Sequence, residues 1–419
     1  MKNLIILSVL AGIAVCHGAN VTQWRGEGRM GIYQEKDLLK EWPAGGPKLL
    51  WSIEDLGEGY SSVIVVDGKI YTTGLGTDAN AGKELLYALD KDGKQLWSVV
   101  YGENWGGAEP KGGDYAPARS TPTFVDGKFY VVSGKGDVAC ITLDGKVAWT
   151  ASIPNDYKGK PGSWGWSISP LVHDGKVICT IASSDGAVLA LDAKTGKKAW
   201  LSGSLSGNAS FVSSNLIEKK GKKQVVGMNS DFIFGVDPAN GKIEWKSPLA
   251  ELKTFGEGGG NRVDINCVTP ILVGDHVISG TGYNVATYAF KVNDALTDGK
   301  LVWMNRDVPV HHGGILADDG LVWAAGDKNV LAGMDATTGE TKAQEKWGKG
   351  SVVAADGMLY SYTERGEFGL FEMNKDNPVK KGGFPVTKGT QQHWSHPVIC
   401  DGILYVRHGN ALMAYEVKK

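Results

Sequence analysis

One short segment recurs along this chain, and the spacing of its copies constrains the fold more than any other feature of the sequence. The copy at residues 190–200 reads ALDAKTGKKAW, with alternating apolar residues, an Asp, a Thr-Gly turn and a terminal tryptophan. The tryptophans that end the copies are Trp97, Trp149, Trp200, Trp245, Trp303 and Trp347. They lie 44 to 58 residues apart along the sequence. This period is typical of the four-stranded blades of a β-propeller.

A second pattern runs in phase with the first. It joins two apolar strands through an Asp-Gly turn, as in SVIVVDGKIYTTG at 62–74, and it occurs eight times when three looser copies are included. Asp and Gly tolerate the positive φ angles that two-residue hairpins require. The sequence therefore predicts an all-β fold, a single eight-bladed β-propeller domain over residues 20–419, built from four-stranded antiparallel blades.

The last repeat is incomplete. Residues 396–417 supply only three strands, whereas PKLLWSI at 47–53 places Trp51 in the pattern of a fourth strand. We therefore expect this N-terminal strand to complete the last blade and close the ring, which removes exposed sheet edges. The repeated tryptophans are expected to pack between neighbouring blades, with ligand stacking by all of them as the alternative. Phe384 is the candidate to replace the tryptophan that the seventh repeat lacks.

The N-terminus has the composition of a secretory signal peptide. Lys2 precedes an apolar run at 4–15, and small residues follow at 18–19, which predicts a signal peptide over 1–19. Lipidation at Cys16 is the alternative, less favoured because Val15 precedes it. No other segment is apolar enough to span a bilayer. We expect a periplasmic or secreted protein without a transmembrane segment.

Charge and cysteine content exclude several partners. The formal net charge is -2, so there is no basic excess to neutralise phosphates and no nucleic-acid partner is expected. Cys140, Cys179, Cys267 and Cys400 are widely spaced, which favours buried free thiols over a disulfide framework. A covalent haem is excluded because no C-x-x-C-H occurs. A monomer is expected.

The repeats resemble the pyrroloquinoline quinone (PQQ) repeat propellers, which include quinoprotein alcohol dehydrogenases and bacterial outer-membrane assembly lipoproteins. The segments QWRGEGRMGIY and LLKEWPAGGPKLLW are also similar to the opening of exported polyvinyl-alcohol-dehydrogenase-like propellers. The likeness covers essentially the whole chain after the signal peptide. It is specific for the fold and weak for activity, because one fold hosts many functions.

The resemblance implies a cofactor site in quinoprotein dehydrogenases, which hold PQQ against a tryptophan with a calcium ion beside it. It makes Asn208 of SGNASF the counterpart of the metal ligand, Asp264 of NRVDINCVTP that of the catalytic base, and Trp166 of SWGWS that of the stacking residue. Two features depart from that pattern. No cysteines are adjacent, and the turn that should carry a ligand Glu is the short SSDGA, which has only Asp185.

Residues just before each innermost strand converge near the axis of a propeller, where functional loops gather on one face. The candidate binding residues of this ring are Tyr60, Arg119, Trp166, Asn208, Asn266, His311, His312, Lys349, His393, Trp394 and His396. Four of them are histidines, which indicates either a metal site or a polar channel. The sequence places no carboxylate with these histidines. The longest loops also lead into this ring, including those that contain residues 101–119 and 250–266.

These observations predict an exported binding module. Its small-molecule or protein ligand would lie at the propeller axis, and full quinoprotein catalysis is not expected because the catalytic residue set is incomplete. One alternative is a PQQ-dependent dehydrogenase that oxidises an alcohol or sugar, with PQQ and calcium as cofactors. A second alternative is a scaffold in cell-envelope protein assembly. Whether the chain is an enzyme stays open from the sequence.

Overall fold

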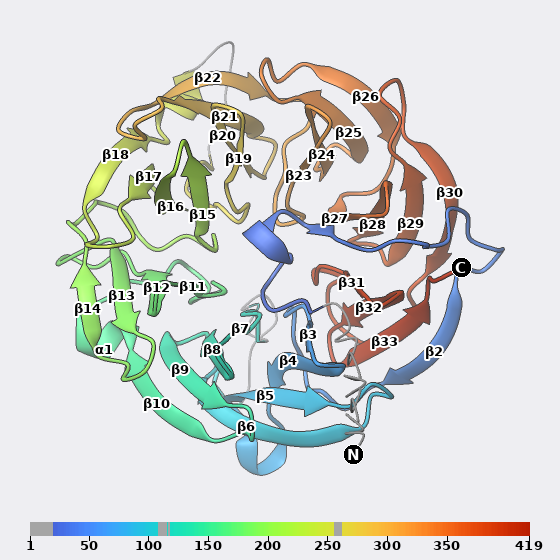
Figure 1. Ribbon diagram of the computed structural model, residues 1–419, viewed down its shortest axis with the longest axis horizontal. Coiled ribbons are helices and arrows are strands. Elements are labelled where there is room, and N and C mark those ends of the chain that lie inside the picture. The colour runs from blue at the N-terminus through green and yellow to red at the C-terminus, as the bar shows by residue number, and fades with distance from the viewer. Residues whose placement is uncertain (1–19, 108–114, 116–117, 255–261) are drawn as a thin grey trace, which may run out of the picture.

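A computed structural model describes residues 20–107, 115, 118–254 and 262–419. The predicted signal peptide, with Cys16, lies outside the described residues. The strands form antiparallel sheets arranged in a ring around a central axis (Figure 1). Each sheet runs outward from a short innermost strand, and this arrangement brings the segments before the innermost strands to the centre.

Within the described residues, six sheets have four strands each. Their strands, in chain order within each sheet, are β3 (Ile64–Val66), β4 (Lys69–Leu75), β5 (Lys83–Leu89) and β6 (Gln95–Glu103); β7 (Thr123–Val125), β8 (Lys128–Val132), β9 (Asp137–Thr142) and β10 (Val147–Ser152); β11 (Leu171–His173), β12 (Lys176–Thr180), β13 (Val188–Asp192) and β14 (Lys198–Leu201); β15 (Asn215–Lys219), β16 (Lys222–Met228), β17 (Phe232–Val236) and β18 (Ile243–Pro248); β19 (Ile271–Val273), β20 (His276–Thr281), β21 (Ala286–Val292) and β22 (Gly299–Asn305); β2 (Lys48–Ile53), β31 (Val398–Cys400), β32 (Ile403–His408) and β33 (Ala411–Glu416).

A seventh sheet holds nine strands and contains two four-stranded meanders. The meanders are β23 (Leu316–Asp318), β24 (Leu321–Gly326), β25 (Val330–Asp335) and β26 (Thr341–Lys346), then β27 (Gly350–Ala355), β28 (Met358–Thr363), β29 (Glu367–Glu372) and β30 (Val379–Pro385). The pair Ala325 and Gly350 joins them, and β1 (Ile32–Tyr33) adds to β27 in parallel. The structure thus confirms an all-β fold of four-stranded units, while eight as the blade number stays a prediction.

The N-terminal strand closes the ring as the sequence predicts. Strand β2 pairs antiparallel with β33, which places Trp51 opposite Ala414. Helical structure among the described residues is limited to short turns, namely η1 (Glu27–Arg29), η2 (Asp78–Asn80), α1 (Ile153–Tyr157) and α2 (Glu251–Thr254). No helix in these ranges is long and apolar enough to cross a membrane.

The tryptophan of the recurring segment contacts the neighbouring sheet. The Trp200 indole N–H donates to the Pro238 carbonyl of the next sheet at 3.0 Å. A Cβ on Gly241, which follows in the same turn, would lie only 2.5 Å from the Trp200 ring. Trp149 meets Gly196 and donates to the Ala193 carbonyl in the same way. The predicted packing of these tryptophans between blades is therefore confirmed.

The polar residues of the recurring segment form its turn. The Asp192 carboxylate accepts hydrogen bonds from the backbone N–H of Lys194 and Thr195 and from the Thr195 hydroxyl. Such an Asp side chain replaces the backbone acceptors of a turn. At the next position, Gly196 has a φ of 70°, a conformation that glycine adopts without the Cβ penalty.

Three further sequence expectations are confirmed. In the Asp-Gly hairpins both residues have positive φ, for example 46° at Asp174 and 66° at Gly175. In the seventh repeat Phe384 takes the place of the tryptophan and packs against a glycine of the next sheet. That glycine is Gly46, shortly before β2, and a Cβ on it would lie 2.5 Å from the Phe384 ring. Within the described residues the four cysteines form no disulfide with one another, and three of them are buried.

Hydrogen bonds also join neighbouring innermost segments near the axis. The backbone N–H of Ser62 donates to the Thr121 hydroxyl at 3.0 Å, and that of Thr121 donates to the Ser169 hydroxyl at 3.0 Å. The Ser169 N–H continues the series to the Ser213 hydroxyl at 2.9 Å. Because buried polar groups need partners, this Ser/Thr belt fixes the spacing of consecutive sheets around the cavity described below.

Residues 21–33, which we call the N-terminal plug, cross the centre of the ring (Figure 1). The buried Arg29 guanidinium donates to the carbonyls of Ser169, Pro170 and Ser214 at 2.7 to 2.9 Å. The buried Arg25 donates to the carbonyls of Ile315 and Val352. The two arginines therefore tie the plug to sheets on opposite sides of the ring.

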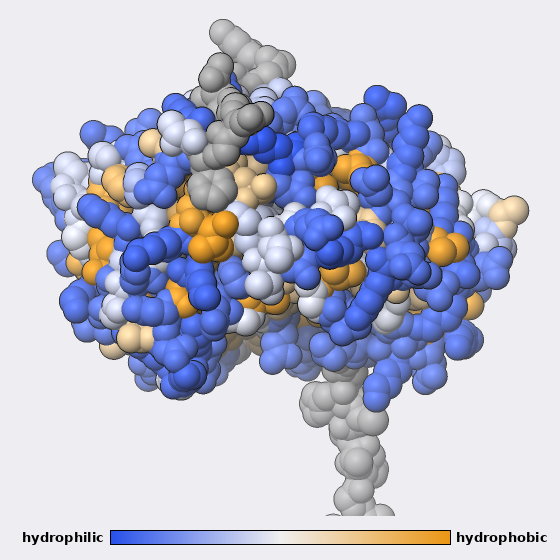
Figure 2. Space-filling view, turned by 90° about the horizontal axis from the view of Figure 1, so that it is seen from above, coloured by the Kyte–Doolittle hydropathy of each residue, from blue (hydrophilic) through white to orange (hydrophobic). Residues whose placement is uncertain are grey.

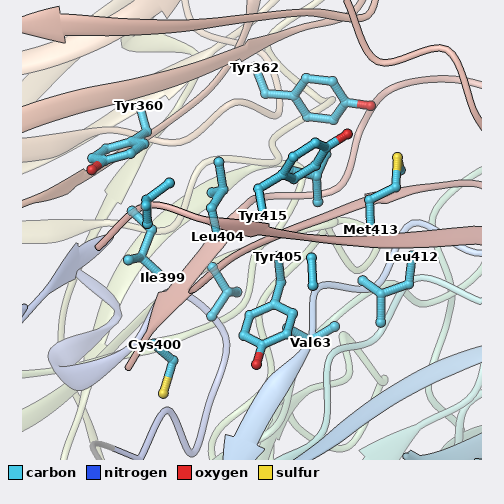
Figure 3. Close-up of a cluster of buried hydrophobic side chains, with 14 of the residues drawn as sticks. Val63, Tyr360, Tyr362, Ile399, Cys400, Leu404, Tyr405, Leu412, Met413 and Tyr415 are labelled. Atoms are coloured by element: carbon cyan, nitrogen blue, oxygen red, sulfur yellow. The ribbon is translucent and has the colours of Figure 1, made fainter. Parts of the chain in front are cut away.

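Hydrophobic clusters fill the interfaces between sheets. One cluster, which includes Tyr360, Tyr362, Leu404, Met413 and Tyr415, joins the last two four-stranded units (Figure 3). The side of the molecule seen in Figure 2 is mainly hydrophilic, with hydrophobic groups in separate places. Packing energy is therefore concentrated between the sheets, which leaves the axial ends available for binding.

Candidate functional site

A cavity of about 190 Å³ lies at the axis, among residues that precede the innermost strands. Its lining is Trp24, Tyr60, Tyr115, Arg119, Trp164, Ser167, Ser169, Phe211, Ser213, Ile265, Cys267, Tyr283, His311, His312, Trp394 and His396. The cavity wall is mostly aromatic, with few polar groups. Such a composition is typical of sites that bind small molecules.

Seven rings follow one another around the cavity, and we call them the aromatic collar. In order they are Phe211, Trp164, Tyr115, Trp394, His312, His311 and Tyr283. The centroids of successive rings are 4.7 to 5.8 Å apart, at tilted or edge-on angles. Aromatic pairs favour these geometries. Because the rings come from loops of different sheets, the collar forms only when the propeller closes.

Trp24 of the N-terminal plug also lines the cavity. Its ring meets His396 edge-on, with centroids 5.1 Å apart. His396 accepts a hydrogen bond from Arg25 at its Nδ1 and donates from Nε2 to the His312 carbonyl, both at 2.9 Å. Burial and the neighbouring guanidinium lower the pKa of His396 well below its ordinary value. The plug therefore fixes a neutral imidazole in the wall of the cavity.

Arg119 supplies the permanent positive charge of the described lining. Its Nη2 donates to the carbonyls of Trp164 and Trp166, whereas its Nε is buried without a hydrogen-bond partner in the described part of the chain. Burial lowers the pKa of Arg119 to about 10, so the group is still cationic at neutral pH. Among the described residues, the cavity lining includes no carboxylate. A buried cation in this state favours an anionic ligand group.

Glu84 is the acidic group behind Arg119. Its carboxyl oxygens accept hydrogen bonds from the Tyr101 hydroxyl at 2.5 Å and from the Gly134 N–H at 2.9 Å. Burial raises the pKa of Glu84 to about 7, against the opposing effect of those hydrogen bonds. Glu84 is therefore only partly ionised at neutral pH and does not fully neutralise Arg119.

A charged network lies behind the two adjacent collar histidines. The Glu364 carboxylate is 2.5 Å from His312 Nε2 and 3.3 Å from Lys349 Nζ. Lys349 also donates to His311 Nδ1 and pairs with Asp327, both at 3.2 Å. Burial raises the pKa of Glu364, but His312 and Lys349 outweigh it and lower the pKa to about 2. Burial and the neighbouring positive charges lower the pKa of His311 to about 3.

The sequence expectation that no carboxylate accompanies the histidines is wrong. Glu364 follows β28, and its oxygen lies within 4.8 Å of ligand atoms of both His311 and His312. The Lys349 ammonium, however, occupies the same place and pairs with the carboxylate. A metal ion there would have to displace this ammonium. The arrangement fits an ion-pair network better than a cation site, since metal ligands must be free to coordinate.

Six of the twelve predicted site residues line the cavity, namely Tyr60, Arg119, His311, His312, Trp394 and His396. Lys349 adjoins them through His311. His393 does not reach the cavity lining and stacks on His408, with centroids 3.6 Å apart. Burial lowers the pKa of His393 to about 4.

The residues transferred from the quinoprotein resemblance are not brought together in the cavity. Trp166 is buried in the core between sheets, where its ring faces Gly136. Asn208 is exposed, and Asp264 is exposed and pairs with Arg262 at 3.2 Å. Asn266 is buried and bonds to the Val263 carbonyl and the Thr281 hydroxyl. Loop geometry explains the difference, because the Trp166 side chain turns inward whereas Trp164 lines the cavity.

Sequence reasoning missed five aromatic residues of the site, Trp24, Tyr115, Trp164, Phe211 and Tyr283. Tyr115, Trp164 and Phe211 lie within four residues of predicted positions, in the irregular segments that lead into the axis. Tyr283 lies in the turn between β20 and β21. Trp24 belongs to the N-terminal segment whose position no local pattern indicates. Parts of the two long loops that the sequence predicts to lead into the ring, residues 108–114, 116–117 and 255–261, lie outside the described residues.

Comparison with known proteins identifies relatives by sequence. The family model described as outer membrane protein assembly factor BamB matches residues 82–345. A segment of 167 residues, 39% of this chain, is 32% identical to 18% of the serine/threonine-protein kinase AfsK of Streptomyces griseus. A segment covering 42% of this chain is 30% identical to 24% of the quinohemoprotein alcohol dehydrogenase ADH-IIG of Pseudomonas putida. The chain thus spans a quarter or less of these curated relatives.

Solved structures show the same fold. BamB from Moraxella catarrhalis matches 88% of this chain and 99% of its own, with a TM-score of 0.59 at 13% identity. The quinohemoprotein alcohol dehydrogenase from Comamonas testosteroni matches 95% of this chain and 80% of its own, with a TM-score of 0.66 at 14% identity. At these identities the likeness shows the propeller fold and leaves the function open.

Proposed function

We propose that this protein is a propeller that binds a ligand in its axial cavity. The premise is that the chain belongs to the family described as outer membrane protein assembly factor BamB. In this proposal the protein works by binding and not by quinone-dependent oxidation. The predicted signal peptide supports a periplasmic or secreted location for it.

One observation carries the proposal, the aromatic collar with unsatisfied polar atoms in its wall. Arg119 Nε and His312 Nδ1 are buried without hydrogen-bond partners in the described residues, and both side chains line the cavity. Buried polar atoms without partners cost about 1 to 3 kcal/mol each. A ligand that supplies these partners would recover this free energy and fill the ring-lined space.

The described residues do not fit a calcium-bound quinone. Calcium takes six to eight oxygen ligands. The described part of the cavity lining has no carboxylate, and the nearest cluster that the structure describes is rich in imidazole nitrogen. Asn208 and Asp264, the counterparts of the metal ligand and the base, are both exposed outside the lining. We therefore derive no catalytic step through PQQ, although the segment shared with the Pseudomonas putida dehydrogenase makes PQQ the cofactor to test.

The experiment is a thermal-shift screen of small molecules against the full chain, followed by calorimetry on each compound that binds. Binding is expected to be lost in Trp164→Ala and retained in Asn208→Ala and Asp264→Ala, which are matched controls on exposed residues of nearby loops. Addition of PQQ and Ca²⁺ with an alcohol and a redox dye forms the second arm. Turnover that depends on Asn208 or Asp264 would overturn the proposal in favour of the dehydrogenase alternative.

A protein ligand is the remaining alternative, since the family model carries the name of an assembly factor. Cross-linking in cells from a photoreactive residue at position 164 tests it directly. Capture of one envelope protein, lost when Arg119 is replaced, would move the proposal from a small molecule to a protein ligand at the same cavity.

A further inference from the structure

The charge of the cavity restricts the class of ligand that it can hold. Arg119 has a buried Nε without a partner, and its Nη2 is held by the Trp164 and Trp166 carbonyls. Because these carbonyls fix the guanidinium plane, the remaining donors have a set direction. A carboxylate matches such a donor group better than a neutral acceptor does, and charge-assisted hydrogen bonds are about twice as strong as neutral ones.

The number of charges in the lining limits the ligand to one carboxylate. Arg119 is the only Arg or Lys in the described lining, and burial lowers the pKa values of the half-buried His311 and the buried His396. The third lining imidazole, His312, already has the Glu364 carboxylate 2.5 Å from its Nε2. A second ligand carboxylate would therefore enter a ring-lined space without an unpaired cation to meet it. Burying an unpaired charge is unfavourable, so a polycarboxylate is disfavoured.

The aromatic collar limits the shape of the rest of the ligand. Trp164 and Trp394 each contact Tyr115, with centroids 5.8 and 5.1 Å from it, so the two indoles flank the region beside Arg119. A flat ring system placed there would contact several of the collar rings. Such aromatic pairs stabilise a bound ring beyond the effect of the area that they bury.

We propose that the axial cavity binds a planar aromatic monocarboxylate, with the carboxylate on Arg119 and the ring system inside the aromatic collar. The proposal rests on the proposed function, because it names the ligand class for the same cavity. It differs from the calcium-bound quinone of the dehydrogenases in requiring no metal ion and a single negative charge.

The test compares three probes by isothermal titration calorimetry on the full chain, namely 2-naphthoate, its neutral amide 2-naphthamide, and naphthalene-2,6-dicarboxylate. We expect 2-naphthoate to bind at least tenfold more tightly than either of the other two. Arg119→Gln is expected to lower the affinity for 2-naphthoate to that of the amide and to leave the amide unchanged. Arg119→Lys, which keeps the charge, should retain an intermediate affinity, and near-ultraviolet circular dichroism verifies that each variant is folded.

Arg365→Gln is the matched control, because Arg365 is exposed and lies outside the cavity lining. Its affinity for 2-naphthoate should equal that of the unmodified protein. Equal binding of acid and amide, with both lost in Trp164→Ala, would overturn the monocarboxylate and leave the proposed function intact. Tighter binding of the dicarboxylate would also overturn it. If no probe binds, the ligand class is refuted, while the screen above decides the proposed function separately.

Discussion

Replacement of Gly241 by alanine tests whether the contact between Trp200 and the next sheet holds neighbouring sheets together. Gly241 has a φ of 79°, and a Cβ there would lie 2.5 Å from Cε3 of the Trp200 ring. Both a backbone cost and a packing cost are therefore expected. The indole is also held by its hydrogen bond to the Pro238 carbonyl, which limits how far the ring can retreat.

The size of the effect follows from these two costs. An alanine at positive φ costs about 1 kcal/mol, and an extra methyl group forced into a packed interface costs about 1 to 3 kcal/mol. Gly241→Ala should therefore lower the free energy of unfolding by about 3 kcal/mol. Gly175→Ala is the matched control, because Gly175 has a φ of 66° but no atom within 4 Å of its added Cβ. That variant should lose only about 1 kcal/mol.

Equilibrium unfolding in urea, followed by tryptophan fluorescence and circular dichroism, measures both variants. The comparison cancels the backbone cost and isolates the contact with Trp200. Losses that agree within about 0.5 kcal/mol, a difference ordinary for unrelated surface changes, would refute the argument that the turn glycine exists to receive the tryptophan of the preceding sheet.

Three further predictions concern the plug, the buried Glu84 behind Arg119, and the exposed loops. Arg29→Met leaves three carbonyls without donors, so it should cost about 3 kcal/mol of unfolding free energy at about 1 kcal/mol each, against no measurable loss in Arg365→Met. The folded-state pKa of Glu84 is about 7, above its ordinary 4.5, so the folded state binds the proton more tightly than the unfolded state does. The free energy of unfolding should therefore fall by about 3 kcal/mol as the pH rises from below 4.5 through 7. Glu84→Gln should remove that part of the pH dependence in urea titrations at pH 4 and pH 8, and an unchanged slope would contradict the assignment. Asn208→Ala with Asp264→Ala should leave calorimetric binding at the cavity unchanged, and a tenfold loss would show that these loops reach the ligand.

The sequence alone determined the propeller, because each feature of the repeat depends on local rules. Alternating residues predict strands, and positive φ at Asp174 and Gly175 follows from the chemistry of the two-residue turn. The Asp192 and Gly196 positions recur in the next repeat, where the Asp237 carboxylate accepts from the Ala239 N–H and Gly241 has a φ of 79°. The sequence also predicts that β2 closes the ring, because the last repeat lacks one strand and β2 pairs with β33.

Only the tertiary structure decided which of the axial residues form the site. Trp164 and Trp166 are two residues apart in an irregular loop, and no period fixes which of them faces the cavity. Arg25 and Arg29 hold the plug at the centre, and their carbonyl partners outside the plug are 140 to 327 residues away in sequence. Strand and turn patterns report on neighbours along the chain, whereas the collar depends on which loops meet when the ring closes.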